Sequence, residues 1–121
     1  MTVANSKRGE VLLRMGGEDK VLRPSFEAMC AIEEQLGSIL TLAMRAAQRG
    51  NPLDSRELSI IITEGMRAFG KAEGTPDKDT SARKVRELMY ADGVASFAAP
   101  VIVFLGNMIK GGAADDAPGK D

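Results

Sequence analysis

The segment DSRELSIIITEGMRAFG, residues 54–70, is the strongest structural signal in the chain. Asp54 and Glu57 stand three residues apart, which is the spacing of a capping box in which an acceptor and a carboxylate each satisfy a free backbone amide. Apolar side chains then recur at helical spacing: Leu58, Ile61, Ile62, Met66 and Phe69. The segment therefore predicts a helix with one apolar face, which we expect to end at Gly70.

Two more helices are predicted before this one. Ser25 can cap a helix that ends at Leu36, because Gly37 suits the left-handed conformation at a helix stop. Its inward face is predicted to carry Phe26, Met29, Ile32 and Leu36. Ser38 can cap the next helix, which we expect to run to Gln48. Its inward face is predicted to carry Ile39, Leu42, Ala43 and Ala46.

The region before Pro24 predicts a β-hairpin. Val11, Leu13 and Met15 alternate with the residues between them, as in a half-buried strand. Gly-Gly-Glu-Asp at 16–19 then supplies turn chemistry before a second short extended run. Because a lone two-stranded hairpin is only marginally stable in water, the face with Val11 and Leu13 should pack on helices.

A fourth helix is predicted after the polar loop at residues 71–79, starting at Thr80 or Ser81. Its inward side chains are predicted to be Val85, Leu88 and Met89. Arg83 and Glu87 are four residues apart, so they can form an ion pair across one turn of this helix.

Residues 94–109 have almost no polar face, so a helix here is either buried on several sides or covered by a partner. Pro100 cannot donate a backbone hydrogen bond and crowds the preceding turn. We therefore favour a kink at Pro100 over a helix that begins near Ala98 with Pro100 in its first turn. The candidate partner-binding residues on this segment are Val94, Phe97, Val101, Phe104, Leu105 and Met108.

Together these elements predict an α+β, mainly α fold, with a short N-terminal hairpin followed by four or five helices around one core. Residues 9–110 should form a single domain. Residues 1–8 are polar and unpatterned and are expected to form a flexible arm, and residues 111–121 are expected to form a disordered acidic tail.

The composition disfavours several classes of function. The chain of 121 residues has 44% hydrophobic residues, enough for one core, and a formal net charge of −1, which gives no strong field for nucleic acid or an anionic membrane. It has no histidine and a single cysteine, so neither an internal disulfide nor a thiolate metal cluster is expected. The longest apolar stretch is shorter than the ~20 residues that span a bilayer, and no signal peptide is evident, which makes the cytoplasm the expected location.

No residue pattern points to catalysis, a cofactor or a metal. Cys30 lacks a histidine that could activate it, so we expect an inert buried thiol. Glu27, Glu33 and Glu34 are spread over a helix surface and do not converge on one cation. Basic residues near the hairpin lack interleaved aromatic residues for stacking on bases. Five methionines are expected to fill the core, although flexible thioethers also suit surfaces that bind apolar partners: Met29, Met44, Met66, Met89 and Met108.

The order of four motifs resembles a known family. Arg-Gly-Glu at 8–10 precedes the hairpin, LRPSFEAMCAIEEQLG occupies 22–37, RGNPL occupies 49–53, and GMRAFG at 65–70 ends the capped helix. These motifs resemble the small tail proteins of gene transfer agents, which are grouped with phage tail tube and tail assembly chaperone proteins. The resemblance covers residues 8–111, and no catalytic residues are carried over with it.

The resemblance implies a factor that binds the long, hydrophobic tape measure protein before tail tube subunits polymerise around it. The alternative is a structural tail component, associated with the tail tube protein, that stays in the particle. A small enzyme or cofactor binder is the third and least supported hypothesis. Whether the chain forms a homo-oligomer is left open by the sequence.

Overall fold

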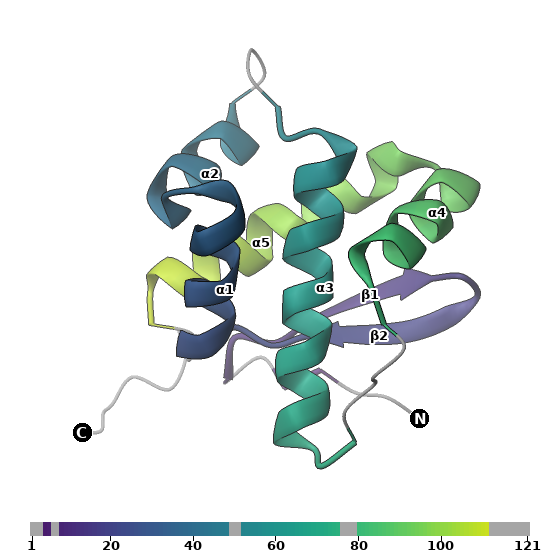
Figure 1. The fold of residues 1–121 in the computed structure, drawn as a ribbon, viewed down its shortest axis with the longest axis horizontal. Helices are drawn as coiled ribbons and strands as arrows, with labels where there is room; N and C mark the ends of the chain where they lie inside the picture. Colours follow the sequence, from purple (N-terminus) through teal and green to yellow (C-terminus); the bar gives the residue numbers. More distant parts are fainter. Residues whose placement is uncertain (1–3, 6–7, 49–51, 76–79, 112–121) are drawn as a thin grey trace.

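The structure, a computed structural model, describes residues 4–5, 8–48, 52–75 and 80–111. In this part of the chain, a two-stranded hairpin is followed by five α-helices and one short 3₁₀-helix (Figure 1). This arrangement confirms the predicted α+β, mainly α fold. Most of the predicted arm at 1–8, nearly all of the predicted tail at 111–121 and the end of the predicted loop at 71–79 lie outside the described residues.

The hairpin consists of β1 (Val11–Met15) and β2 (Glu18–Leu22), paired antiparallel. Gly16 and Gly17 form the turn, with φ of 63° and 78°. A two-residue turn of this kind requires positive φ at both positions, which glycine adopts without strain. The turn is shorter than the four residues predicted, because the last two of them already pair in β2. The buried apolar side chains of the hairpin are Leu13, Met15, Val21 and Leu22.

Helices α1 (Phe26–Leu36) and α2 (Ile39–Ala47) begin at their predicted caps. The Ser25 hydroxyl accepts a hydrogen bond from the Ala28 amide at 3.0 Å. The Ser38 hydroxyl accepts one from the next helix's first turn at 3.4 Å. Each bond satisfies one of the amides that a helix start leaves free, so the two helix starts are local features of the sequence.

Phe26 and Met44 are corrections to the predicted inward faces, because they are 75% and 62% exposed. Helix α1 buries the side that carries Ala28 and Ile32. Each residue advances the helix by roughly 100°, so Phe26 lies nearly opposite Ala28. Met44 is likewise on the outer side of α2, whose buried residues are Ile39 and Leu42.

Helix α3 (Ser55–Ala72) lies at the centre of the molecule, with α1 and α2 on one side of it and α4 on the other (Figure 1). The predicted capping box is present: the Asp54 carboxylate accepts from the Glu57 amide at 2.8 Å, and the Glu57 carboxylate accepts from the Asp54 amide at 2.9 Å. The helix continues past Gly70, contrary to the prediction. Gly74, with φ of 74°, adopts the left-handed conformation just beyond the helix end.

Helix α4 (Ala82–Asp92) starts at Ser81, one of the two predicted positions, and the 3₁₀-helix η2 (Val94–Phe97) leads into helix α5 (Ala98–Ile109). Pro100 therefore lies in the first turn of α5, and the favoured kink was wrong. A proline is tolerated there because the first amides of a helix have no partner within it. Leu88, predicted inward, is partly exposed and contacts the hairpin turn.

One apolar core joins all of these elements, with α5 crossing behind α3 (Figure 1). Among the described residues, no single helix is long and apolar enough to cross a membrane. Helix α4 and residues 94–109 meet that test of length and composition only as a pair, and the pair is bent by 116°.

Candidate protein-binding surfaces

The six candidate partner-binding residues of the last helical segment lie on its inner side. Phe97, Val101, Phe104, Leu105 and Met108 are buried in the core, and Val94 is half-buried against it. Val94 and Phe97 belong to η2, and the other four residues form the inner side of α5, which contacts α2, α3 and the hairpin. A partner that binds the folded domain therefore meets other residues first.

The outer side of α5 carries a second apolar stripe, which we call the α5 stripe: Ile102, Val103 and Ile109. All three are partly exposed, and no charged residue occurs between Ala98 and Ile109. The sequence predicted that this helix is either buried on several sides or covered by a partner. Burial accounts for only part of its surface. The remaining apolar surface is available to a partner.

Helix α2, which packs against α5, carries an exposed apolar stripe of its own. We call Leu40, Met44 and Ala47 the α2 stripe, since their spacing of four and three residues aligns them along one side of the helix. Leu40 is 60% exposed and Met44 is 62% exposed. Two neighbouring helices thus both expose apolar side chains to water.

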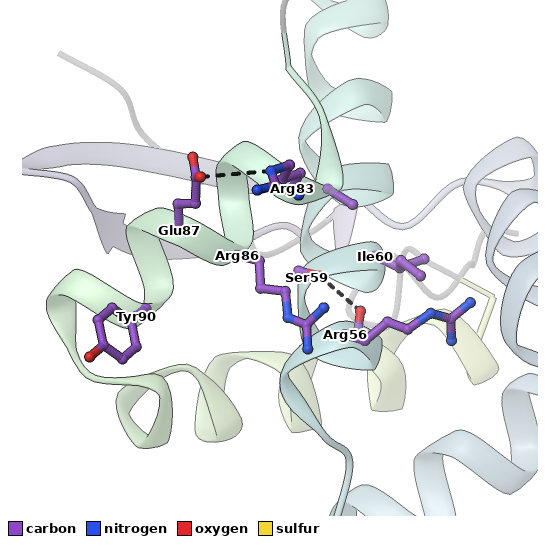
Figure 2. A pocket seen from close by; sticks show the side chains of 8 residues that line it. Arg56, Ser59, Ile60, Arg83, Arg86, Glu87 and Tyr90 are labelled. Carbon is purple, nitrogen blue, oxygen red and sulfur yellow. Dashed lines mark hydrogen bonds and ion pairs between the residues drawn. The ribbon is translucent and has the colours of Figure 1, made fainter.

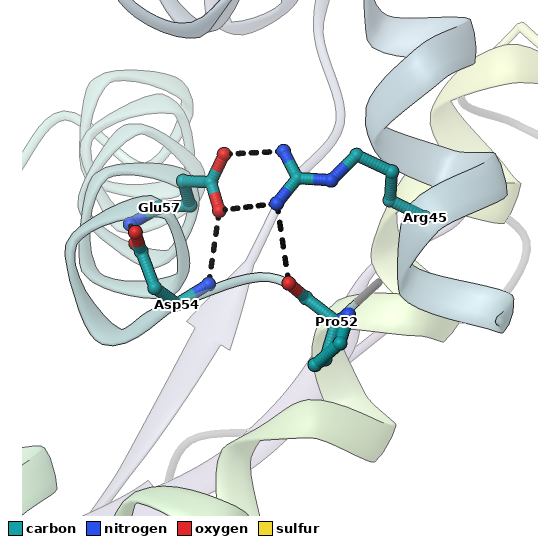
Figure 3. A network of polar contacts seen from close by, with 4 residues as sticks. All are labelled: Arg45, Pro52, Asp54 and Glu57. Atoms are coloured by element: carbon teal, nitrogen blue, oxygen red, sulfur yellow. Dashed lines mark hydrogen bonds and ion pairs between the residues drawn. The ribbon is translucent and has the colours of Figure 1, made fainter. Parts of the chain in front are cut away.

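A polar network holds the one charged side chain of α2 away from the α2 stripe. Arg45, the only charged residue of α2, turns toward α3 and forms a two-pronged ion pair with Glu57, at 2.6 and 3.0 Å (Figure 3). It also donates to the Pro52 carbonyl at 3.1 Å. The hydrogen bond with Glu57 raises the pKa of the Arg45 guanidinium. The network links the end of α2 to the start of α3, and it keeps the Arg45 guanidinium off the α2 stripe.

A smaller apolar hollow of about 310 Å³ lies where α1 begins and α5 ends. Its lining includes Phe26, Met29 and Met108. Phe26 projects beside this hollow with most of its ring in water. Flexible thioethers next to an exposed aromatic ring can adjust to apolar side chains of different shapes.

A larger hollow, about 560 Å³, lies between α3 and α4 and has a different chemistry (Figure 2). Its lining contains three arginines and one carboxylate, together with an exposed tyrosine: Arg56, Arg83, Arg86, Glu87 and Tyr90. Figure 2 shows Arg86 reaching from α4 toward α3. We call this hollow the arginine groove.

The acidic and cysteine side chains of the described residues are dispersed. No group of three or more Cys, Asp or Glu side chains there could hold a metal ion. Cys30 is half-buried rather than fully buried as predicted, because it lies on α1 away from the inward Ala28 and Ile32 side.

Residues 8–111 match the family described as "Phage tail tube protein, GTA-gp10". The chain belongs to this family. It is accordingly a tail protein of the phage and gene transfer agent type, as the resemblance of its motifs indicated. No curated protein and no solved structure matches the chain.

For this tail protein, all candidate residues lie on the buried side of the last helical segment, and none was predicted on α2. The exposed stripe residues Leu40, Val103 and Ile109 were not among the candidates. The signal that could have indicated exposed apolar residues is that α2 contains one charged residue and α5 contains none, since an ordinary surface helix carries polar residues on its outer side. The arginine groove was also missed, because its residues come from two helices that are separated in the sequence.

Proposed function

We propose that this tail protein is a non-enzymatic tail assembly chaperone that binds the tape measure protein in the host cytoplasm before the tail tube forms around it. The main support is the pair of exposed apolar stripes on α2 and α5, on a chain whose family belongs to phage tails. Contiguous exposed apolar residues on a small protein are typical of surfaces that bind other proteins.

The two stripes suit a helical partner. A helix that exposes an apolar side can pack along the α2 stripe by the same ridge and groove contacts that join helices inside proteins. The lack of charge on both stripes avoids the cost of removing charged groups from water on binding. Each copy then offers only a modest apolar area, so many weakly bound copies along one long partner can still be displaced by tube subunits.

Co-expression tests the proposal directly. The wild-type chain should increase the soluble fraction of the tape measure protein, and the double variant Leu40→Asp, Met44→Asp should lose most of that effect. The matched control is Lys84→Asp, which changes the net charge by the same amount at an exposed position of α4. Equal loss of activity in both variants, or no solubilisation by the wild type, would argue against a chaperone that uses the α2 stripe.

A structural role in the particle is the second candidate, and the family description, which names a tail tube protein, favours it. Tail tubes are usually built from β-rich rings, and a two-stranded hairpin is too small to form one. The structural role that we consider is therefore that of an accessory protein associated with the tube. Mass spectrometry of purified particles separates the two roles. A chaperone should be absent from finished tails, whereas a structural component should be present in a fixed ratio to the tube protein.

A further inference from the structure

We infer that the arginine groove between α3 and α4 is a second docking site, which binds an acidic segment of a partner protein. This inference does not depend on the α2 and α5 stripes, because the groove is formed by other side chains. The groove would bind carboxylates, whereas the two stripes are proposed to bind apolar side chains.

The first argument is that the cations of the groove have few partners within the chain. Six other cations of the described residues have a carboxylate oxygen within 3.2 Å: Arg14, Lys20, Arg23, Arg45, Arg67 and Lys71. In the groove, neither Arg56 nor Arg86 has an ion pair within the described part of the chain. Arg83 approaches Glu87 only to 3.8 Å, with both side chains mostly exposed.

The second argument is the way Arg86 is held. Its Nε donates to the Ser55 hydroxyl at the start of α3, at 2.9 Å. This bond positions the guanidinium between the two helices but uses only one of its five N–H donors. The two terminal nitrogens stay available, and their planar geometry matches a carboxylate that accepts two parallel hydrogen bonds.

The third argument is that apolar surface accompanies the charges. Tyr90 is 82% exposed at one end of the groove, and Ile60, which is almost fully buried, lines the α3 side. Ser59 and Ala82 have small side chains, which lets a partner backbone approach the helices closely. A segment that alternates carboxylates with an apolar side chain satisfies both features of the groove.

Aromatic content favours a protein segment over nucleic acid. Tyr90 is the single aromatic residue of the groove lining. Single-stranded nucleic acid is typically bound by an extended cationic track with several aromatic rings for stacking. With one aromatic ring, the groove offers no such track.

The test measures binding of a fluorescent peptide with repeated Glu-Glu-Leu and Glu-Glu-Phe units to the full chain by fluorescence anisotropy. Arg56→Gln, Arg83→Gln and Arg86→Gln should each weaken binding by about two- to fivefold, as expected for exposed charge pairs. The matched control is Lys84→Gln, which removes one positive charge from α4 outside the groove lining and should leave binding nearly unchanged. Circular dichroism should verify that each variant is folded.

Three results would overturn the inference: no binding of the peptide, equal weakening by Lys84→Gln and the arginine variants, or tighter binding of single-stranded DNA than of the peptide. The variant Leu40→Asp, Met44→Asp should retain peptide binding. A failure of the groove and a failure of the proposed chaperone function are therefore distinguishable.

Discussion

Gly65 lies where α3 packs closely against both the hairpin and α5. A Cβ atom at this position would stand 2.9 Å from the Leu22 Cβ and 3.0 Å from the Phe104 Cζ. The Leu22 Cβ is tied to its strand and cannot move away cheaply. We expect Gly65→Ala to lower the free energy of unfolding by about 1–3 kcal/mol, measured by urea denaturation, because the added methyl overpacks the core.

Gly106 provides the matched control for this prediction. It also lies inside a helix, α5, but a Cβ there would meet no atom within 4 Å. Gly106→Ala should therefore raise the free energy of unfolding by about 0.5–1 kcal/mol through helix propensity alone. Opposite signs for the two substitutions support the close packing at Gly65, and equal signs would contradict it.

Glu10 is the buried carboxylate that joins the N-terminal residues to the hairpin. It accepts a hydrogen bond from the Asn5 amide at 2.8 Å and pairs with Arg23 at 2.9 Å. Glu10→Gln keeps an acceptor but removes the charge opposite Arg23. We expect a loss of about 1–3 kcal/mol in the free energy of unfolding, measured by urea denaturation at neutral pH.

Glu18→Gln is the control, since Glu18 pairs with Lys20 at 2.8 Å on the exposed surface. The hydrogen bond with Lys20 lowers the pKa of Glu18, so its stabilising effect is present above the unfolded pKa and is lost as pH falls through the lowered one. Water screens this exposed pair, so the substitution should have little measurable effect at neutral pH. A comparable loss in both variants would show that burial of Glu10 does not matter.

At the scale of the helix, the position of Pro100 can be tested by the sign of a substitution. In the first turn of α5, Pro100 restricts the unfolded chain without removing a helical hydrogen bond. Pro100→Ala should therefore lower the free energy of unfolding by about 0.4–1 kcal/mol in thermal or urea denaturation. A stabilising effect would instead indicate a strained kink.

Val103→Pro completes this comparison, because it places a proline in the interior of the same helix at an exposed position. Loss of one backbone hydrogen bond and a clash with the preceding turn should cost about 3 kcal/mol or more. Similar effects of the two proline changes would contradict the helix start at Ala98.

At the scale of the whole molecule, the shared core predicts cooperative unfolding. Side chains of the hairpin and of α1 to α5 pack in one cluster, so no element can lose its contacts alone. Calorimetry should give one transition with equal calorimetric and van't Hoff enthalpies, of about 70 kcal/mol for a domain of roughly 100 residues. Two separable transitions would contradict the proposal that residues 9–110 form one domain.

Local chemistry made much of this fold predictable from the sequence. Paired glycines at 16 and 17 predicted the hairpin turn, and Ser25, Ser81 and the Asp54 capping box predicted helix starts. Each of these features depends on the conformational preference of one residue or on hydrogen bonds within one turn. None of them depends on contacts with distant parts of the chain.

Tertiary packing decided which apolar side chains of α1, α2 and α5 face water. Phe26 and Met44 are as apolar as their buried neighbours, and a helix such as α5, apolar all round, contains no sequence signal for its inward side. The side that faces inward depends on where α3 and the hairpin lie. The packing of α4 against α3 likewise brings Arg56 and Arg86 into one groove. The sequence therefore specified the elements, whereas the surfaces proposed to bind partners arose from contacts between residues that are far apart in the chain.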